Sequence, residues 1–125
     1  MSGAEQYKKN AHHTATNEQL VLLLFEKAIT LMWASREKLQ EQNKLDAIEN
    51  LHKVRQLFSE LQASLDQDGG EVALNLHQLY TYILKEVSTA GFKGDPQALE
   101  NAISVAEELY EGFFQAFSNE PTAET

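Results

Sequence analysis

The sequence predicts an all-α fold, an antiparallel up-down four-helix bundle with a mobile N-terminal arm. Apolar residues recur at helical spacing along nearly the whole chain, and no sustained alternation of period two occurs. Only two prolines are present, and short turn-like segments divide the chain into long uninterrupted stretches. Four long helices joined by short connections are most simply arranged as an up-down bundle.

The 125 residues are expected to form one domain, with an arm at 1–15, helices within 16–118 and a polar tail at 119–125. The formal net charge is −9, so nucleic acid is not an expected partner, because phosphate binding needs a basic surface. No apolar run is long enough to cross a membrane, and the N-terminus is not of signal-peptide type. We therefore expect a cytoplasmic protein without membrane insertion.

The first helix is predicted to run from about Asn17 to about Gln42, with Thr16 as its N-cap. The residues before it are polar and are expected to form the mobile arm. The apolar arc of this helix covers about half of its circumference, roughly twice the width that a surface helix of a bundle needs. This helix should therefore pack on more than one side.

The second helix is predicted from Lys44 to about Leu65, with Asn43 as its cap. Its apolar residues alternate in spacings of four and three, which is typical of antiparallel bundles. This seam consists of Ala47, Leu51, Val54, Phe58, Leu61 and Leu65.

The third helix is predicted to end at Ala90, with Gly91 as the left-handed residue that follows it. Its core face is expected to contain Val72, Ala73, Leu76, Leu79, Tyr80, Ile83 and Val87. Asp95 and Pro96 should begin the fourth helix as N-cap and first helical residue. That helix should run to about Phe117, with an apolar half made of Leu99, Ala102, Ile103, Ala106, Leu109, Tyr110, Phe113, Phe114 and Phe117.

Catalytic and metal-binding patterns are nearly missing from the sequence. One Glu-x-x-His motif, Glu49 to His52, has the spacing found in di-iron bundles, but such sites need two motifs and two further glutamates. Its phase also places it away from the seam, toward water. We therefore predict no catalytic residue, no metal site, no cofactor and no enzymatic activity.

The apolar surface of the first and fourth helices exceeds what the interior of a bundle should need. Two interpretations remain open. In the first, the core is simply thick and some leucines remain at the surface. Alternatively, the bundle has a groove that receives the amphipathic helix of a partner, and Tyr7 on the arm covers it when it is empty.

Three motifs follow one another along nearly the whole chain. The first joins the arm to the first helix and comprises Tyr7, Asn10, Thr14, Ala15, Glu18 and Leu20. The second continues this helix with Leu24, Phe25, Ala28 and Ile29. The third and most specific comprises Ser64, Leu65, Asp66, Gly69, Gly70, Asn75, Leu76, Leu79, Tyr80 and Tyr82. In these motifs and their order the chain resembles the FliS family of flagellar secretion chaperones over nearly its whole length, with Phe25 in place of the family's usual tyrosine.

The resemblance implies an export chaperone that binds the C-terminal segment of flagellin, prevents premature polymerisation and supports delivery to the flagellar export gate. It implies contacts from the arm and helix start through Tyr7, Asn10 and Thr14. The groove wall would comprise Leu20, Leu23, Leu24, Ile29, Leu65, Leu79, Tyr80 and Tyr82. The alternative is a general helical interaction bundle that self-associates through its excess apolar surface.

Overall fold

The computed structural model describes the backbone of residues 3–65 and 68–119, and side chains within 17–65 and 68–118. Four helices account for nearly all of these residues: α1 (Gly3–Gln40), α2 (Lys44–Ala63), α3 (Gly70–Lys93) and α4 (Pro96–Asn119). Each helix packs against two others, α1 against α2 and α4, and α3 against α2 and α4. The predicted all-α bundle is confirmed.

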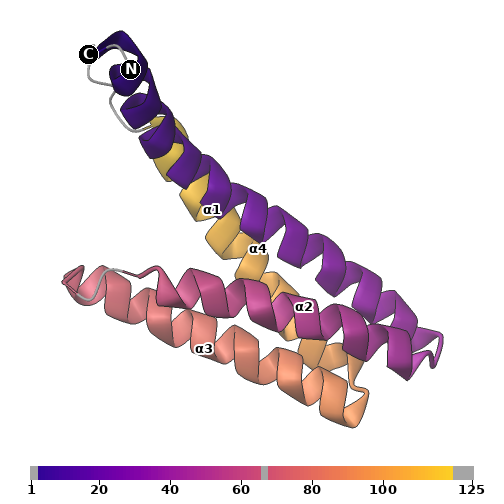
Figure 1. Cartoon of the computed structure of the whole chain (residues 1–125). Helices are drawn as coiled ribbons and strands as arrows, with labels where there is room; N and C mark the ends of the chain where they lie inside the picture. The colour runs from indigo at the N-terminus through magenta and orange to yellow at the C-terminus, as the bar shows by residue number, and fades with distance from the viewer. Residues whose placement is uncertain (1–2, 66–67, 120–125) are drawn as a thin grey trace.

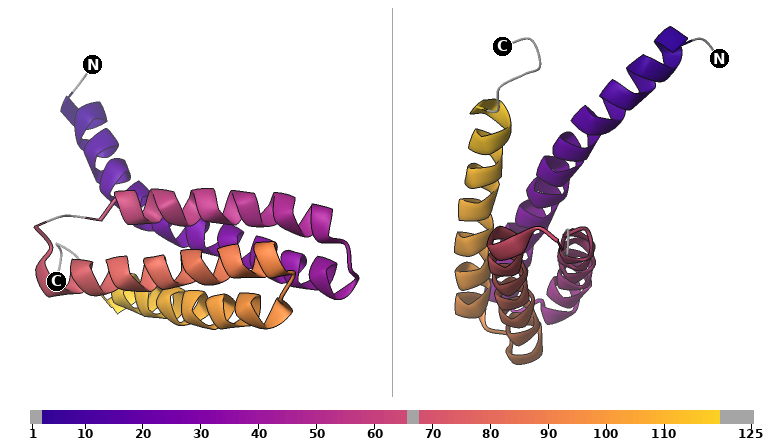
Figure 2. Two further views of the ribbon diagram at one scale, coloured as in Figure 1. Left: turned by 90° about the horizontal axis from the view of Figure 1, so that it is seen from below. Right: turned by 90° about the vertical axis from the view of Figure 1, so that its left-hand side faces the viewer.

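The helices form two antiparallel pairs, α1 with α4 and α2 with α3 (Figure 1). The pairs lie together near the α1–α2 and α3–α4 turns. Toward the other end, the first half of α1 and the last half of α4 project away from the α2–α3 pair (Figure 2). The bundle is therefore closed at one end and splayed at the other.

Two predicted helix caps are present in the structure. The Asn43 side chain accepts a hydrogen bond from the backbone N–H of Asp46 at 3.4 Å, at the start of α2. The Asp95 carboxylate accepts one from the N–H of Gln97 at 2.9 Å, at the start of α4. Both caps satisfy helix N–H groups that have no partner within their helix.

The start of α1 and the end of α3 differ from the prediction. Helix α1 begins at Gly3 rather than near Asn17, so Thr16 lies within the helix, and no proline or glycine in residues 4–16 interrupts it. Helix α3 continues through Gly91 to Lys93, and Gly94 takes the left-handed conformation at φ +65°. The reversal falls at Gly94 because the chain must turn there to reach Pro96, whereas Gly91 keeps helical geometry.

An aromatic layer in the bundle takes one ring from each helix. Phe25 of α1 lies 5.7 Å from Phe58 of α2, 6.1 Å from Tyr80 of α3 and 5.5 Å from Phe113 of α4, between ring centroids. From this layer to the closed end the core is continuous. It includes the predicted α2 seam, of which Ala47, Leu51, Val54, Phe58 and Leu61 are buried and Leu65 is half-buried.

Beyond the aromatic layer, burial stops on three of the helices. No residue of 17–24, 70–79 or 107–118 is buried. The predicted core face of α3 is therefore wrong for Val72, which is 70% exposed, and Leu79, which is 37% exposed, whereas Ala73 and Leu76 are half-buried and Leu76 packs against the core. The reason is tertiary: α4 and α1 diverge from α3 along this stretch and leave its apolar side without a cover (Figure 1).

Candidate functional site

The uncovered part of the bundle is the candidate functional site. We call it the open end and define it as residues 17–24 of α1, 59–65 at the end of α2, 70–79 of α3 and 107–118 of α4. Its exposed large hydrophobic side chains are Leu20, Leu23, Val72, Leu74, Leu79 and Phe114. Such a concentration of apolar side chains in water is typical of a surface that binds a protein partner.

The first hollow of the open end lies between α1 and α2 and has a volume of about 420 Å³. Apolar side chains from both helices form most of its wall. The lining residues are Asn17, Leu20, Val21, Leu24, Glu60, Leu61 and Ser64. A hollow with this lining suits the apolar side chains of a partner, with the Glu60 carboxylate at its edge.

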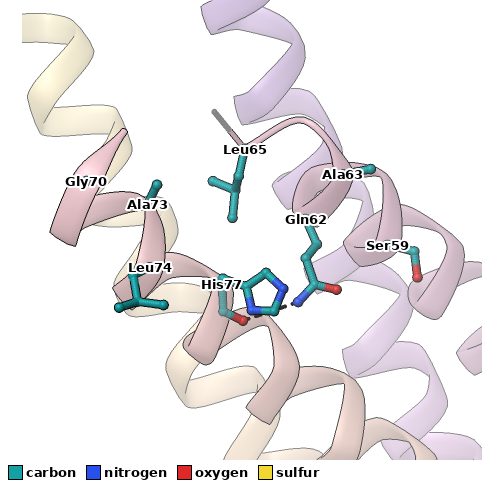
Figure 3. Close-up of a pocket in the computed structure, with 8 residues that line it drawn as sticks. All are labelled: Ser59, Gln62, Ala63, Leu65, Gly70, Ala73, Leu74 and His77. Atoms are coloured by element: carbon teal, nitrogen blue, oxygen red, sulfur yellow. Dashed lines mark hydrogen bonds between the residues drawn. The ribbon is translucent and has the colours of Figure 1, made fainter. Parts of the chain in front are cut away.

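The second hollow lies between the end of α2 and the start of α3, with a volume of about 470 Å³ (Figure 3). The polar residues Ser59, Gln62 and His77 line it together with Leu65 and Leu74. Figure 3 shows Leu65 and the Gln62 amide pointing toward the space between the two helices. This lining offers both apolar contact and hydrogen-bonding groups.

A small hydrogen-bond network fixes the floor of this second hollow. The Gln62 amide nitrogen donates to the His77 carbonyl at 3.2 Å and to the Thr81 hydroxyl at 2.9 Å. The Thr81 hydroxyl in turn donates to the same His77 carbonyl at 2.9 Å. The two bonds of the Gln62 side chain join the end of α2 to α3 beside the hollow.

The structure brings some of the expected groove residues together and separates others. Leu20 and Leu24 line the first hollow, Leu65 lines the second, and Leu23 is 60% exposed on α1. Ile29 is half-buried against the core. Leu79 and Tyr82 are exposed on α3, and neither lines one of these two hollows.

Tyr80 occupies a different place from its neighbours in the sequence. It is only 2% exposed and packs in the aromatic layer, where it contacts Phe25 and Phe58. Burial raises the pKa of the Tyr80 phenol to about 12, because the charged form would lose its hydration. Tyr80 therefore belongs to the aromatic layer that underlies the open end. A partner does not reach it in this conformation.

The arm residues Tyr7, Asn10 and Thr14 lie in the helical backbone of α1, and their side chains are outside the described residues. Val21, Leu61 and Leu74 line the hollows although the sequence analysis did not assign them to the groove. The signal for Val21 was its place in the wide apolar arc. For Leu74 it was an apolar residue lying off the core face of its helix.

Polar contacts join α1 to α4 on the other side of the bundle. Arg36 forms an ion pair with Glu100, and the Trp33 indole N–H donates to the Glu107 carboxylate at 3.1 Å. Burial and the adjacent Glu26 carboxylate together raise the pKa of the Tyr110 phenol. These contacts link α1 to α4 at partly exposed positions.

Within the described residues, no three His, Asp or Glu side chains come together in a group that could hold a metal ion. The described helices also include none that is long and apolar enough to cross a membrane.

Comparison with known proteins identifies the family. The family described as "Flagellar protein FliS" matches residues 1–120. Two relatives named flagellar secretion chaperone FliS are each 30% identical: the Vibrio cholerae protein over 96 residues, covering 76% of this chain and 71% of the relative, and the Salmonella typhimurium protein over 120 residues, covering 91% and 89%.

A solved structure described as a flagellar chaperone from bacteria has the same fold. It superposes with a TM-score of 0.76 at 23% sequence identity, covering 83% of this chain and 85% of the other. Together with the family match, this confirms the resemblance that the motifs predicted. The chain belongs to the FliS family of flagellar proteins, a family of secretion chaperones and not of enzymes.

Proposed function

We propose that the protein is a cytoplasmic export chaperone that binds the C-terminal segment of flagellin at the open end. Binding there keeps the segment from premature polymerisation and supports delivery to the flagellar export apparatus. The family membership supports the chaperone role. The single observation that carries the choice of site is the uncovered apolar surface of residues 17–24, 70–79 and 107–118.

The physical basis of binding is the burial of two apolar surfaces against each other. An unfilled apolar surface and the apolar face of an unassembled helix are both unfavourable in water, and their contact removes both from it. Ordering a flexible segment costs about 2–5 kcal/mol, so the contact must extend over several helical turns. The open end offers this length, because α1, α3 and α4 each contribute more than one uncovered turn.

The arm enters this proposal through its continuity with α1. Tyr7, Asn10 and Thr14 precede Leu20 and Leu23 on the same helix, and Leu20 lines the first hollow. If the arm covers the open end in the free protein, deletion of residues 1–15 should increase the fluorescence of a hydrophobic dye. Unchanged dye fluorescence would remove the arm from the mechanism.

Titration calorimetry with the C-terminal peptide of the flagellin from the same organism tests the proposal. We expect a stoichiometry near 1:1 and a negative heat-capacity change, since apolar surface is buried. Absence of heat and of any mobility shift with this peptide would refute flagellin binding.

Self-association of the bundle is the second candidate, because the same exposed leucines and Phe114 could pack against another copy. Sedimentation velocity over a range of protein concentrations separates the two functions. A monomer that changes its sedimentation only when the flagellin peptide is added supports the chaperone. A dimer that the peptide does not dissociate supports self-association.

A further inference from the structure

A second group of exposed hydrophobic side chains lies at the closed end of the bundle, away from the open end. Leu45 is 82% exposed and Ile48 is 42% exposed on α2, and Phe92 is 83% exposed on α3. A hollow of about 480 Å³ lies between these helices. It is lined by Ile48, Leu51, His52, Arg55, Val87, Ser88, Gly91 and Phe92. We call the hollow with Leu45 the turn-end patch.

Gly91 lies in this hollow and has no explanation within the fold. It is inside α3 without a positive φ, and a Cβ there would meet Leu51 Cδ1 at 3.6 Å, an ordinary contact. Alanine would therefore fit and would favour the helix. The missing Cβ deepens the hollow between Ile48 and Phe92 and leaves space there for a side chain of another protein chain.

The charge around the turn-end patch is opposite to that of the whole chain. The chain carries −9, yet no residue that lines the hollow is a carboxylate, and Arg55 and His52 are among them. Lys44 Nζ donates to the Phe92 carbonyl at 3.2 Å. Lys85 lies two helical turns before Phe92 on the same side of α3, whereas Lys93 lies on the opposite side of α3 from Gly91.

One exposed carboxylate lies beside the patch: Glu49 follows Leu45 by four residues and precedes His52 by three residues on α2. Asp46 lies on the opposite side of α2 from Ile48 and is held by the Asn43 side chain at 2.9 Å. Asp95, beyond Gly94, caps α4 through Gln97. Lys44, Arg55 and Lys85, the basic rim of the hollow, therefore outnumber this carboxylate.

We propose that the turn-end patch docks an amphipathic helix of a second protein, one whose apolar stripe is flanked by Asp and Glu. A groove between two antiparallel helices accepts such a stripe through side chains spaced by three and four residues. The flanking carboxylates would pair with Lys44, Arg55 and Lys85 and set the orientation of the helix. The basic rim disfavours a second copy of this chain, because two-fold symmetry would bring cation against cation.

This inference does not depend on flagellin binding. The turn-end patch lies at the closed end, whereas the hollows of the open end lie beside residues 17–24 and 70–77. The hollow of the turn-end patch shares no lining residue with either hollow of the open end. Both partners could therefore be bound at once, and either could fail to bind without affecting the other.

NMR titration of the whole protein tests the inference. The probe is a stapled helix of about five turns with leucines at i, i+3, i+4 and i+7 and glutamates elsewhere. Its control carries lysines in place of the glutamates. We expect the glutamate helix to shift the amide signals of Ile48, Gly91 and Phe92, with at least about tenfold higher affinity than the lysine helix.

Two variants make the result specific. Phe92→Asp, at a side chain that is 83% exposed, should weaken the glutamate helix about tenfold or more and leave the circular dichroism spectrum unchanged. Leu23→Ser at the open end is the matched control and should leave its binding unchanged. Equal affinity for both probes, or shifts confined to residues 17–24 and 107–118, would overturn the inference. Concentration-dependent dimerisation that Phe92→Asp abolishes would assign the patch to a second copy instead.

Discussion

The ring of Phe25 on α1 meets the ring of Phe58 on α2 edge to face, with centroids 5.7 Å apart and ring planes at 85°. Phe25 is fully buried and also contacts Tyr80 and Phe113, so it is the ring that all three other helices share. The aromatic layer ends the continuous core and forms the floor below the open end. The following predictions depend on this division between a closed core and an uncovered end.

Replacement of Phe25 by alanine should destabilise the protein by about 3–5 kcal/mol, because it removes a ring that contacts all other helices and leaves a cavity. Urea unfolding followed by circular dichroism measures this change. Leu23→Ala is the matched control on the same helix, since Leu23 is 60% exposed, and should cost less than about 1 kcal/mol. Similar losses in the two variants would contradict the proposed position of the core boundary.

Replacement of Leu20 and Leu23 by serine should weaken binding of the flagellin peptide by about tenfold or more, because both side chains are exposed at the open end. The free energy of unfolding should change little, since these side chains contribute little to the core. Calorimetry and urea unfolding measure the two quantities. The control Leu45→Ser removes an exposed leucine from the closed end and should bind the peptide like the wild type.

Stability should fall above about pH 10 because of Tyr80. Burial raises the pKa of Tyr80 to about 12, whereas the unfolded chain should titrate near the usual 10.0. Between these values the unfolded state releases the phenol proton first, so rising pH favours unfolding. The contribution present below pH 10 is lost by about pH 12 and amounts to roughly 2–3 kcal/mol.

Urea unfolding of wild type and Tyr80→Phe from about pH 9 to about pH 12 measures this loss. The phenylalanine variant keeps the ring and cannot ionise, so its stability should decline less steeply. Other groups that titrate in this range are common to both proteins and cancel in the difference. Parallel pH profiles would show that the Tyr80 phenol is not held neutral by the fold.

The ion pair between Arg36 and Glu100 should contribute little to stability. The Arg36 side chain is 27% exposed and the Glu100 side chain is 35% exposed, so water screens their attraction. A double-mutant cycle with Arg36→Ala and Glu100→Ala should give a coupling free energy below about 1 kcal/mol. A value of several kcal/mol would mean that this pair, rather than the aromatic layer, holds α1 to α4.

Gly91→Ala should raise the free energy of unfolding by about 0.5–1 kcal/mol, because alanine favours the helix and its Cβ meets only an ordinary contact at Leu51. The same substitution at Gly94, where φ is +65°, should destabilise the protein and is the matched control. Thermal unfolding measures both. A destabilised Gly91→Ala protein would show that the fold itself requires this glycine.

Several features could be predicted from the sequence because they depend on local pattern. The spacing of Ala47, Leu51 and Val54 predicted the buried side of α2. Asn43 and Asp95 predicted helix starts through the chemistry of their side chains. The predicted end of α3 at Ala90 was wrong, because both Gly91 and Gly94 can take the left-handed conformation and only the path to Pro96 distinguishes them.

The candidate site could be predicted only in part. Excess apolar residues on the first and fourth helices indicated a binding surface, and the motifs indicated the family. Tyr80 and Tyr82 were assigned to one groove wall, but Tyr80 is buried in the aromatic layer and Tyr82 is 39% exposed. Side chains that are two positions apart on a helix point in different directions, so Tyr80 and Tyr82 have different neighbours. Those neighbours decide which of the two side chains is exposed to solvent.

The sequence by itself determined four helices, the apolar side of each and membership of a chaperone family. Apolar periodicity, helix-capping residues and family motifs depend only on the order of residues along the chain. Only the tertiary structure decided where the core ends. Val72 and Val87 share the apolar side of α3, yet Val72 is 70% exposed and Val87 is 1% exposed. The difference arises because burial requires a neighbouring helix, and the second half of α4 diverges from the first half of α3 (Figure 1).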